Sequence, residues 1–354
     1  MNDPAVQRLA GAVYSSPLEY GANKVSKAEL IKGRVSFGAH EEYRVLLDGN
    51  GESAATPSGT LRAYGGLPAV GDWVWVRPAG EFSLIEAVEA RKTAFVRRAT
   101  GRAHAAQCVA ANVDLCFVIC GLDGDFNLRR VERYLVLAWE SGARPVVVLN
   151  KSDICPDVEA ALEAVRCVAG RAEVVAMSAS RSVEPLKSWL QPGLTAALLG
   201  SSGAGKSTIA NALTGRAFAT GEVRESDSRG RHTTTARMLM AAPNGAWLID
   251  TPGMRELGLL ASESSLDLGF PEIAAVAGQC RFADCGHEQE PGCAVRTALE
   301  EGRISPGRWM SYMKLQREAR HHMLEADVSA QRAEKQKWKA IHKANKRMYR
   351  DRGH

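Results

Sequence analysis

The sequence lacks an apolar run long enough to cross a membrane, and its first residues lack the apolar segment of an export signal. No stretch of about 18 consecutive apolar residues occurs in the chain of 354 residues. The first thirty residues carry charged side chains throughout, among them Asp3, Arg8 and Glu19. Both absences argue against a secretory leader and a membrane anchor. We therefore expect a cytoplasmic protein with no membrane partner.

Cysteine is scarce, and most of it is isolated. Five of the eight cysteines lie alone in apolar surroundings, as buried thiols do in a reducing compartment. The other three lie together in CRFADCGHEQEPGC, with the spacing C-x4-C-x-H-x5-C. Three thiolates and an imidazole are the donor set of a closed, structural zinc site, so we predict one zinc ion per chain. The predicted ligands are Cys280, Cys285, His287 and Cys293; the alternative is three buried cysteines near an unrelated histidine.

Positive charge is concentrated at the end of the chain. Residues 331–354 contain nine Lys and Arg against Glu334 and Asp351, a balance of +7, so the other 330 residues sum to −2 of the total of +5. Trp338 and Tyr349 are interleaved with these charges. A basic tail with aromatic residues favours contact with a nucleic-acid backbone and its bases. The alternative is a solvated helix without a partner.

The length predicts two or three domains. The first is a small β-barrel of the OB type over residues 34–100, after a partly ordered extension over residues 1–33. Such a barrel often binds oligonucleotides, although it can also serve as a spacer. A polar linker is expected over residues 97–107. The barrel prediction rests on five short β-type runs, each closed by a turn residue: GRVSFG, EYRVLLDGNG, TLRAYGG, GDWVWVRP and FSLIEAVEA.

An α/β domain over residues 101–262 contains a phosphate-binding motif. An apolar run at 194–199 ends at GSSGAGKS, which fits G-x-x-x-x-G-K-[ST] and is followed by a helical segment. The glycines allow backbone N–H groups to turn toward phosphate oxygens, Lys206 would reach the β- and γ-phosphates, and Ser207 would bind Mg²⁺. The alternative is a Gly/Ser linker. The predicted phosphate-binding residues are Gly200, Ser201, Ser202, Gly203, Ala204, Gly205, Lys206, Ser207 and Thr208.

A second motif indicates that the base is guanine. The apolar strand at 144–149 ends in N-K-S-D, where Asp153 could accept hydrogen bonds from the ring N–H and the exocyclic amine of guanine. Asn150 would support the base edge, and Lys151 would lie along the ring face. Ser178 and Ala179, in S-A-S after the next strand, could offer backbone N–H to the guanine carbonyl. The alternative is structural, because a strand-end Asn followed by an Asp helix cap is common.

Two segments would sense the γ-phosphate. The polar stretch 228–235 predicts a mobile loop in which Thr234 closes over the γ-phosphate and Mg²⁺. The D-T-P-G that follows an apolar strand places Asp250 for the water shell of Mg²⁺ and the N–H of Gly253 for the γ-phosphate.

The order of these motifs predicts a circular permutation. In ordinary GTPases the phosphate loop precedes N-K-x-D, whereas here N-K-S-D and S-A-S precede it. Sheet packing does not depend on where the termini fall, so the α/β fold can persist. The chain then leaves the GTPase domain just after D-T-P-G. It enters a mainly helical zinc-binding domain over residues 263–330, and then the basic tail.

Taken together, the barrel, N-K-S-D, S-A-S, GSSGAGKST, G-R-H-T-T-T, D-T-P-G and the cysteine cluster resemble the RsgA (YjeQ) family of circularly permuted GTPases. The resemblance covers roughly residues 34–325. It implies a monomeric GTP hydrolase that acts late in small ribosomal subunit maturation. The subunit would stimulate it, and GTP or GDP would control its binding to rRNA. The alternatives are a GTP-dependent RNA-binding scaffold with incidental hydrolysis, and a small-metabolite kinase, for which no acceptor pocket is predicted.

The resemblance also bears on the attacking water. Met254 follows D-T-P-G, where Ras-like enzymes place a water-orienting glutamine, and a thioether cannot replace that group. The family similarity and the chemistry both point to His232, beside the threonines of the polar loop, as the residue that positions water. The alternative is an RNA-contacting or merely exposed histidine.

Overall fold

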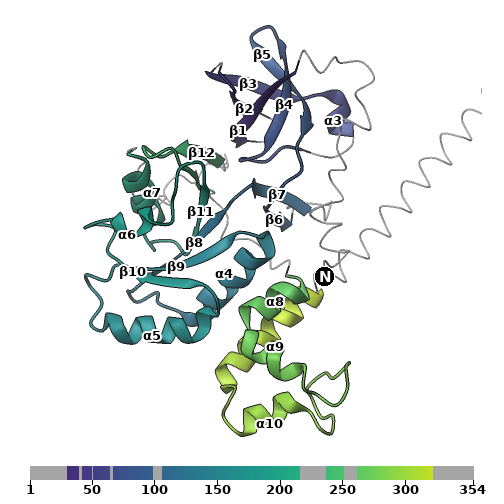
Figure 1. Ribbon diagram of the computed structural model, residues 1–354, viewed down its shortest axis with the longest axis vertical. Coiled ribbons are helices and arrows are strands. Elements are labelled where there is room, and N and C mark those ends of the chain that lie inside the picture. Colours follow the sequence, from purple (N-terminus) through teal and green to yellow (C-terminus); the bar gives the residue numbers. More distant parts are fainter. Residues whose placement is uncertain are drawn as a thin grey trace, which may run out of the picture.

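The computed structural model describes seven segments of the chain. They form three bodies along the long axis, with a β-barrel at one end, an α/β sheet in the middle and a group of helices at the other end (Figure 1). Among these described residues, no helix is long and apolar enough to span a membrane. The described segments are residues 30–39, 42–49, 51–63, 67–98, 106–215, 237–250 and 261–321.

The N-terminal body is a closed barrel of five strands, as predicted. It closes because β1 pairs with β2 on one side and with β4 on the other, and the strand order around it is β1-β2-β3-β5-β4. Alternate side chains of these strands, such as Val35, Val45 and Ile85, are fully buried inside it. The strands are β1 (Ile31–Ala39), β2 (Glu42–Leu47), β3 (Gly51–Pro57), β4 (Trp73–Ala79) and β5 (Phe82–Val88).

Two sequence predictions in this region were wrong in detail. The first four residues of the run TLRAYGG lie in the short helix α3 (Gly59–Ala63) and not in a strand, and the third barrel strand is β3. Strand β3 reads GESAATP, whose small residues hide the alternation that marks a half-buried strand. The predicted linker at 97–107 begins and ends in the strands β6 (Ala94–Arg98) and β7 (Ala106–Ala111), which pair as an antiparallel ribbon.

The central body is a doubly wound sheet. Its strand order is β10-β9-β8-β11-β13-β12, and all neighbours except β12 and β13 are parallel. Strand β11, which precedes the phosphate loop, lies in the middle between β8 and β13. The strands are β8 (Leu115–Gly121), β9 (Arg144–Asn150), β10 (Glu173–Ala176), β11 (Thr195–Gly200), β12 (Arg237–Ala241) and β13 (Trp247–Asp250).

Helices cover both faces of this sheet. Strands β8, β9 and β11 are apolar along nearly their whole length because alternate side chains enter two different cores. On one face Val118 and Leu149 pack with α4 and α5, and on the other Phe117 and Leu198 pack with α6 and α7. The helices are α4 (Leu128–Ser141), α5 (Val158–Ala169), α6 (Glu184–Lys187) and α7 (Lys206–Thr214).

The barrel and the α/β sheet are joined through β1 and β12. Phe37 pairs with Met238 and Gly38 with Arg237, so eleven strands form one continuous sheet. Arg34, which is 5% exposed, crosses this junction and donates to Thr195 Oγ1 at 2.7 Å. Burial lowers the pKa of Arg34 to about 10, although Asp114 and Asp72 act in the opposite direction. The barrel and the strand of the phosphate loop therefore share one buried cation.

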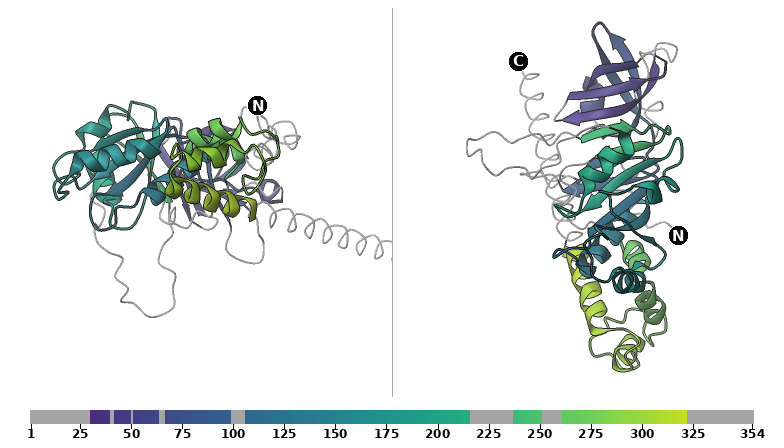
Figure 2. Two further views of the ribbon diagram at one scale, coloured as in Figure 1. Left: turned by 90° about the horizontal axis from the view of Figure 1, so that it is seen from below. Right: turned by 90° about the vertical axis from the view of Figure 1, so that its left-hand side faces the viewer.

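The C-terminal helices dock on α4, at the end of the molecule opposite the barrel (Figure 2). Arg308 donates to Glu132 Oε1 of α4 at 2.8 Å and to Glu272 Oε1 at 2.6 Å, and Arg308 and Glu132 are both buried. A buried charge is tolerated only when it is paired, so this network fixes how the helices sit on α4. These helices are α8 (Glu263–Gly269), α9 (Pro271–Ala277), α10 (Ala294–Glu300) and a helix through residues 306–321.

Candidate functional site

The phosphate loop requires glycine at two positions for steric reasons. A Cβ on Gly200 would lie 2.3 Å from the carbonyl oxygen of Ile119 on the neighbouring strand β8. Gly205 has φ of +96°, and a Cβ there would lie 2.1 Å from Asn150 Nδ2. Gly203 also has positive φ, +73°, but no atom lies within 4 Å of its added Cβ. The loop is therefore held against β8 and the N-K-S-D segment while its middle stays open.

Lys206 and Asp250 lie at the same edge of the sheet because β11 and β13 are parallel neighbours. The ammonium of Lys206 donates to the carbonyl oxygens of Gly200, at 2.8 Å, and Ser201. Burial raises the pKa of Asp250, while the nearby Lys206 acts to lower it. Ser207 and Thr208 lie in the first turn of α7, which no side chain caps, and the N-terminal end of a helix is suited to bind an anion.

The side chain of Asn150 holds three loops together. Its Nδ2 donates to the carbonyl oxygen of Ala204 in the phosphate loop at 2.8 Å, and its Oδ1 accepts from the backbone N–H of Ala179 at 2.8 Å. Asp153 is exposed, and a hydrogen bond from Ser178 holds the pKa of its carboxyl below the ordinary value. The N-K-S-D, S-A-S and phosphate-loop segments, far apart in the sequence, are thus brought to one place.

Two acidic residues of this site were missed by the sequence analysis. Asp123 accepts a hydrogen bond from Lys151 Nζ at 2.5 Å. The carboxyl of Asp125 has a lowered pKa, first because the Ser201 side chain hydrogen-bonds to it and second because Arg130 does. Both residues follow the apolar strand β8 directly, and acidic residues at the carboxyl end of such a strand are the signal that could have found them.

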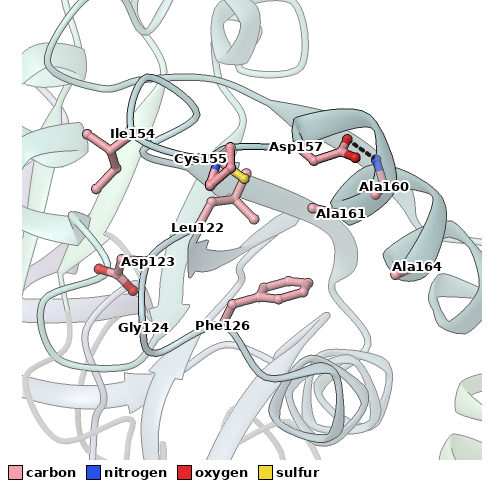
Figure 3. Close-up of a pocket in the computed structure, with 11 residues that line it drawn as sticks. Leu122, Asp123, Gly124, Phe126, Ile154, Cys155, Asp157, Ala160, Ala161 and Ala164 are labelled. Carbon is pink, nitrogen blue, oxygen red and sulfur yellow. Dashed lines mark hydrogen bonds between the residues drawn. The ribbon is translucent and has the colours of Figure 1, made fainter.

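An apolar cavity of about 580 Å³ lies beside these acidic residues (Figure 3). It opens between the connection that follows β8 and the segment that leads from N-K-S-D into α5. Its wall includes Asp123 and Phe126 from the first segment, and Ile154, Cys155 and Asp157 from the second. Asp157 is occupied as the N-cap of α5, because its Oδ1 accepts from the N–H of Ala160.

Thr234 and Gly253, predicted to sense the γ-phosphate, and His232, predicted to position the attacking water, lie outside the described residues. The described strands nevertheless fix where these segments attach. Met238 near the start of β12 pairs with Asp250 at the end of β13, at the edge where β11 enters the phosphate loop. The described strand ends Arg237 and Asp250 therefore lie at the same edge of the sheet as the phosphate loop.

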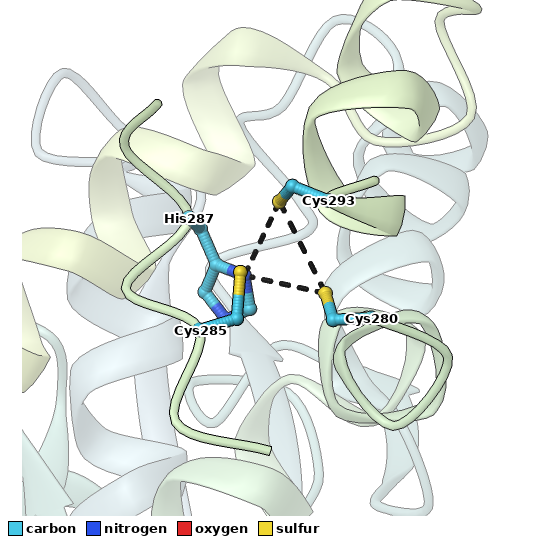
Figure 4. Close-up of side chains that lie close together, drawn as sticks. All are labelled: Cys280, Cys285, His287 and Cys293. Atoms are coloured by element: carbon cyan, nitrogen blue, oxygen red, sulfur yellow. Dashed lines mark hydrogen bonds between the residues drawn. The ribbon is translucent and has the colours of Figure 1, made fainter. Parts of the chain in front are cut away.

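The four predicted metal ligands converge in the C-terminal helices, and their ligand atoms all lie within 4.8 Å of one another (Figure 4). Nδ1 of His287 lies 3.6 Å from Cys280 Sγ and 3.5 Å from Cys293 Sγ, and these two sulfurs are 4.0 Å apart. With Zn–S of about 2.3 Å and Zn–N of about 2.0 Å, tetrahedral geometry puts sulfur about 3.5 Å from nitrogen and about 3.8 Å from another sulfur. The cluster is consistent with a zinc site.

The loop that carries the ligands is shaped by its own hydrogen bonds. The carboxylate of Glu290 accepts from the backbone N–H groups of Gly286, Glu288 and Gln289 at 2.8 to 3.0 Å. His287 has φ of +60° within this turn, and its ring meets Trp309 edge to face at 5.9 Å. Desolvation lowers the pKa of His287, which favours the neutral imidazole that a metal requires.

The fold and the site together define a class of protein. A phosphate loop on the central strand of a doubly wound sheet, with N-K-x-D placed earlier in the chain and beside it in space, is the arrangement of a circularly permuted P-loop GTPase.

Comparisons with known proteins identify the family. The sequence pattern of the RsgA GTPase family matches residues 88–260. The small ribosomal subunit biogenesis GTPase RsgA of Opitutus terrae is 50% identical over 325 residues, covering 87% of this chain and 89% of that protein. The protein of that name from Leptospira interrogans is 42% identical over 331 residues and covers 92% of both chains. The chain therefore belongs to the RsgA family and is a GTP hydrolase.

Solved structures agree with this assignment. The crystal structure of YjeQ from Thermotoga maritima superposes with a TM-score of 0.61 at 26% identity, over 82% of this chain and 98% of that one. YloQ, described as a circularly permuted GTPase, superposes with a TM-score of 0.59 at 21% identity, over 84% of this chain and 98% of that one, and shares the fold.

Proposed function

We propose that this GTPase acts on the small ribosomal subunit late in its maturation, and that its nucleotide state controls its hold on subunit rRNA. The observation that carries the proposal is the likeness, over about nine-tenths of the chain, to proteins named small ribosomal subunit biogenesis GTPase. The subunit would stimulate hydrolysis, because loops that rRNA orders can complete a catalytic site.

Within the nucleotide site, each predicted residue has a proposed role. Asp153 reads the guanine edge, and the phosphate loop with Lys206 holds the phosphates. Ser207 and Thr234 would bind Mg²⁺, with Asp250 in the water shell of the ion, and His232 would position the attacking water. The described residues of this set lie together at one edge of the sheet, which supports these roles.

Two contacts support communication between the nucleotide and the RNA-binding parts. Strand β12, which follows the loop that carries Thr234, pairs with β1 of the barrel. Helix α4, which follows the connection beside the phosphate loop, carries Glu132 and thus the docking site of the C-terminal helices. A change in loop order can therefore reposition both ends of the molecule.

Binding of the subunit at a fixed salt concentration tests the proposal. We expect the form with a non-hydrolysable GTP analogue to bind small subunits 5- to 150-fold more tightly than the GDP form, the range of ordinary allosteric coupling. By reciprocity, subunits should raise the affinity for the analogue relative to GDP by the same factor. Thr234→Ala should shrink both effects together, because it removes a γ-phosphate contact.

Removal of residues 331–354 is the control for that experiment. The loss of nine basic side chains should weaken binding in both nucleotide states alike and flatten its salt dependence. Equal subunit affinity in the two nucleotide states, together with GTP turnover that subunits do not stimulate, would contradict the proposal. That result would favour the scaffold function instead.

The metal proposal has a separate test. Protein purified without chelator should contain one zinc ion per chain, and a strong chelator should remove it. Hydrogen exchange over residues 270–321 should then increase, because four protein ligands leave zinc a structural role. Affinity for GDP should change little, since the cluster lies in the C-terminal helices and outside the nucleotide site. Elemental analysis that finds no zinc would rule the proposal out.

A further inference from the structure

The connection that follows β8 contacts both parts of the proposed nucleotide site. Leu122 N donates to the carbonyl oxygen of Asn150 at 2.8 Å, which fixes the start of this connection against N-K-S-D. One residue further along the chain, the Asp123 carboxylate accepts a hydrogen bond from the ammonium of Lys151. Beyond it, the side chain of Ser201 in the phosphate loop lowers the pKa of the Asp125 carboxyl. Nothing in the motifs of the family assigns a role to these two carboxylates.

Asp123 is itself held in place. Its Oδ1 accepts from the backbone N–H of Asp125 at 3.0 Å, while its Oδ2 accepts from Lys151 at 2.5 Å. Its side chain is 26% exposed and that of Lys151 is 32% exposed, so water only partly screens the pair. A Cβ on Gly121 would lie 3.2 Å from Asp123 Oδ1, so glycine leaves room for the carboxylate. The hydrogen bond from Lys151 also lowers the pKa of Asp123 and keeps it ionised.

We propose that Asp123 is a positioning residue for guanine-nucleotide binding, which acts by fixing Lys151. Lys151 has φ of +65°, so its backbone lies in the left-handed region, and this conformation sets the direction in which its side chain starts. Asp123 fixes the other end of that chain. A lysine anchored at both ends loses little conformational entropy when its methylene groups contact the base. This inference rests on the proposed nucleotide site.

The test measures equilibrium binding of GDP to the full chain. Asp123→Asn should weaken binding about tenfold, because it replaces a charge-assisted hydrogen bond with a weaker one and frees the lysine. Lys151→Met should weaken binding by a similar or larger factor. In the Lys151→Met background, Asp123→Asn should change affinity less than about twofold, because Asp123 acts only through the lysine.

Two further variants make the result specific. Asp123→Glu keeps the charge and should stay within about threefold of the parent. Asp157→Asn is the matched control, because Asp157 lines the same cavity and asparagine caps a helix as well as aspartate does. Its affinity for GDP should not change. Thermal melting of each variant without nucleotide shows that it is folded.

Three results would overturn the inference. The first is that the effects of Asp123→Asn and Lys151→Met on GDP affinity add in the double variant. The second is that Asp123→Asn binds GDP as tightly as the parent does, and the third is that Asp123→Glu binds GDP as weakly as Asp123→Asn does. Measuring the preference for GDP over xanthosine diphosphate distinguishes a failure of this inference from a failure of the proposed nucleotide site. Asp123→Asn should leave that preference intact, whereas Asp153→Asn should change it. An unchanged preference in Asp153→Asn would instead contradict the proposed base site.

Discussion

Asp153→Asn is expected to convert the protein from a guanine to a xanthine nucleotide binder. Affinity for GDP should fall about a thousandfold, because a pair of hydrogen bonds to the ring N–H and amine is lost. Xanthosine diphosphate carries a carbonyl where guanine has the amine, and the new side-chain amide can donate to it. Competition binding with the two diphosphates measures the change.

The structure indicates that Asp153→Asn can change the base preference without disturbing the fold. Asp153 is exposed, and the Ser178 side chain lowers the pKa of its carboxyl by a hydrogen bond that an asparagine oxygen can also accept. The change should therefore leave the free energy of unfolding nearly unaltered. Asp157→Asn, four positions along the same segment, is the control and should keep the parental preference for guanine. If Asp153→Asn retains that preference, Asp153 does not read the base.

Gly205→Ala is expected to abolish nucleotide binding, with a loss of affinity of at least about a hundredfold. The added methyl group would lie 2.1 Å from Asn150 Nδ2, so Asn150 must move. Its hydrogen bonds to Ala204 and Ala179 would break together, and the three loops of the site would separate. The positive φ of Gly205 adds about 1–2 kcal/mol of backbone strain. Titration with GDP measures the loss.

Gly203→Ala is the matched control in the same loop. Gly203 has φ of +73°, so alanine brings similar backbone strain, but its methyl group would meet no atom within 4 Å. We expect a loss of affinity of no more than about thirtyfold, which corresponds to backbone strain of about 1–2 kcal/mol alone. Equal losses in the two variants would mean that backbone strain, and not the contact with Asn150, accounts for the requirement for glycine.

Much of the fold could be predicted because its signals are local. The apolar runs at 144–149 and 194–199 were predicted from the sequence, and they form the buried strands β9 and β11. The third barrel strand was missed because its small and partly exposed residues, GESAATP, show no clear period. The pairing of β6 with β7 was missed because the sequence over residues 97–107 is polar and basic, as in a linker.

The residues of the candidate site also fall into two groups, those that local sequence patterns predict and those that only the fold brings together. Phosphate-loop, N-K-S-D and metal-ligand residues are recognisable because their chemistry needs fixed residue types at short, fixed spacings. Asp123 and Asp125 have no such spacing to their partners. Asp123 lies 28 residues before Lys151, and only the pairing of β8 with β9 brings the two together.

The sequence by itself determined the class of chemistry, the permuted order of the motifs and the cluster of three cysteines and a histidine, because each motif that indicates them is a short pattern of neighbouring residues. Only the tertiary structure decided that Asn150 ties three loops together, that β1 extends the GTPase sheet into the barrel, and that Arg308 joins the C-terminal helices to Glu132 of α4. Arg308 and Glu132 are 176 residues apart. No local pattern encodes such a pair, because its stability comes from burial and mutual charge compensation, which exist only once the chain has packed.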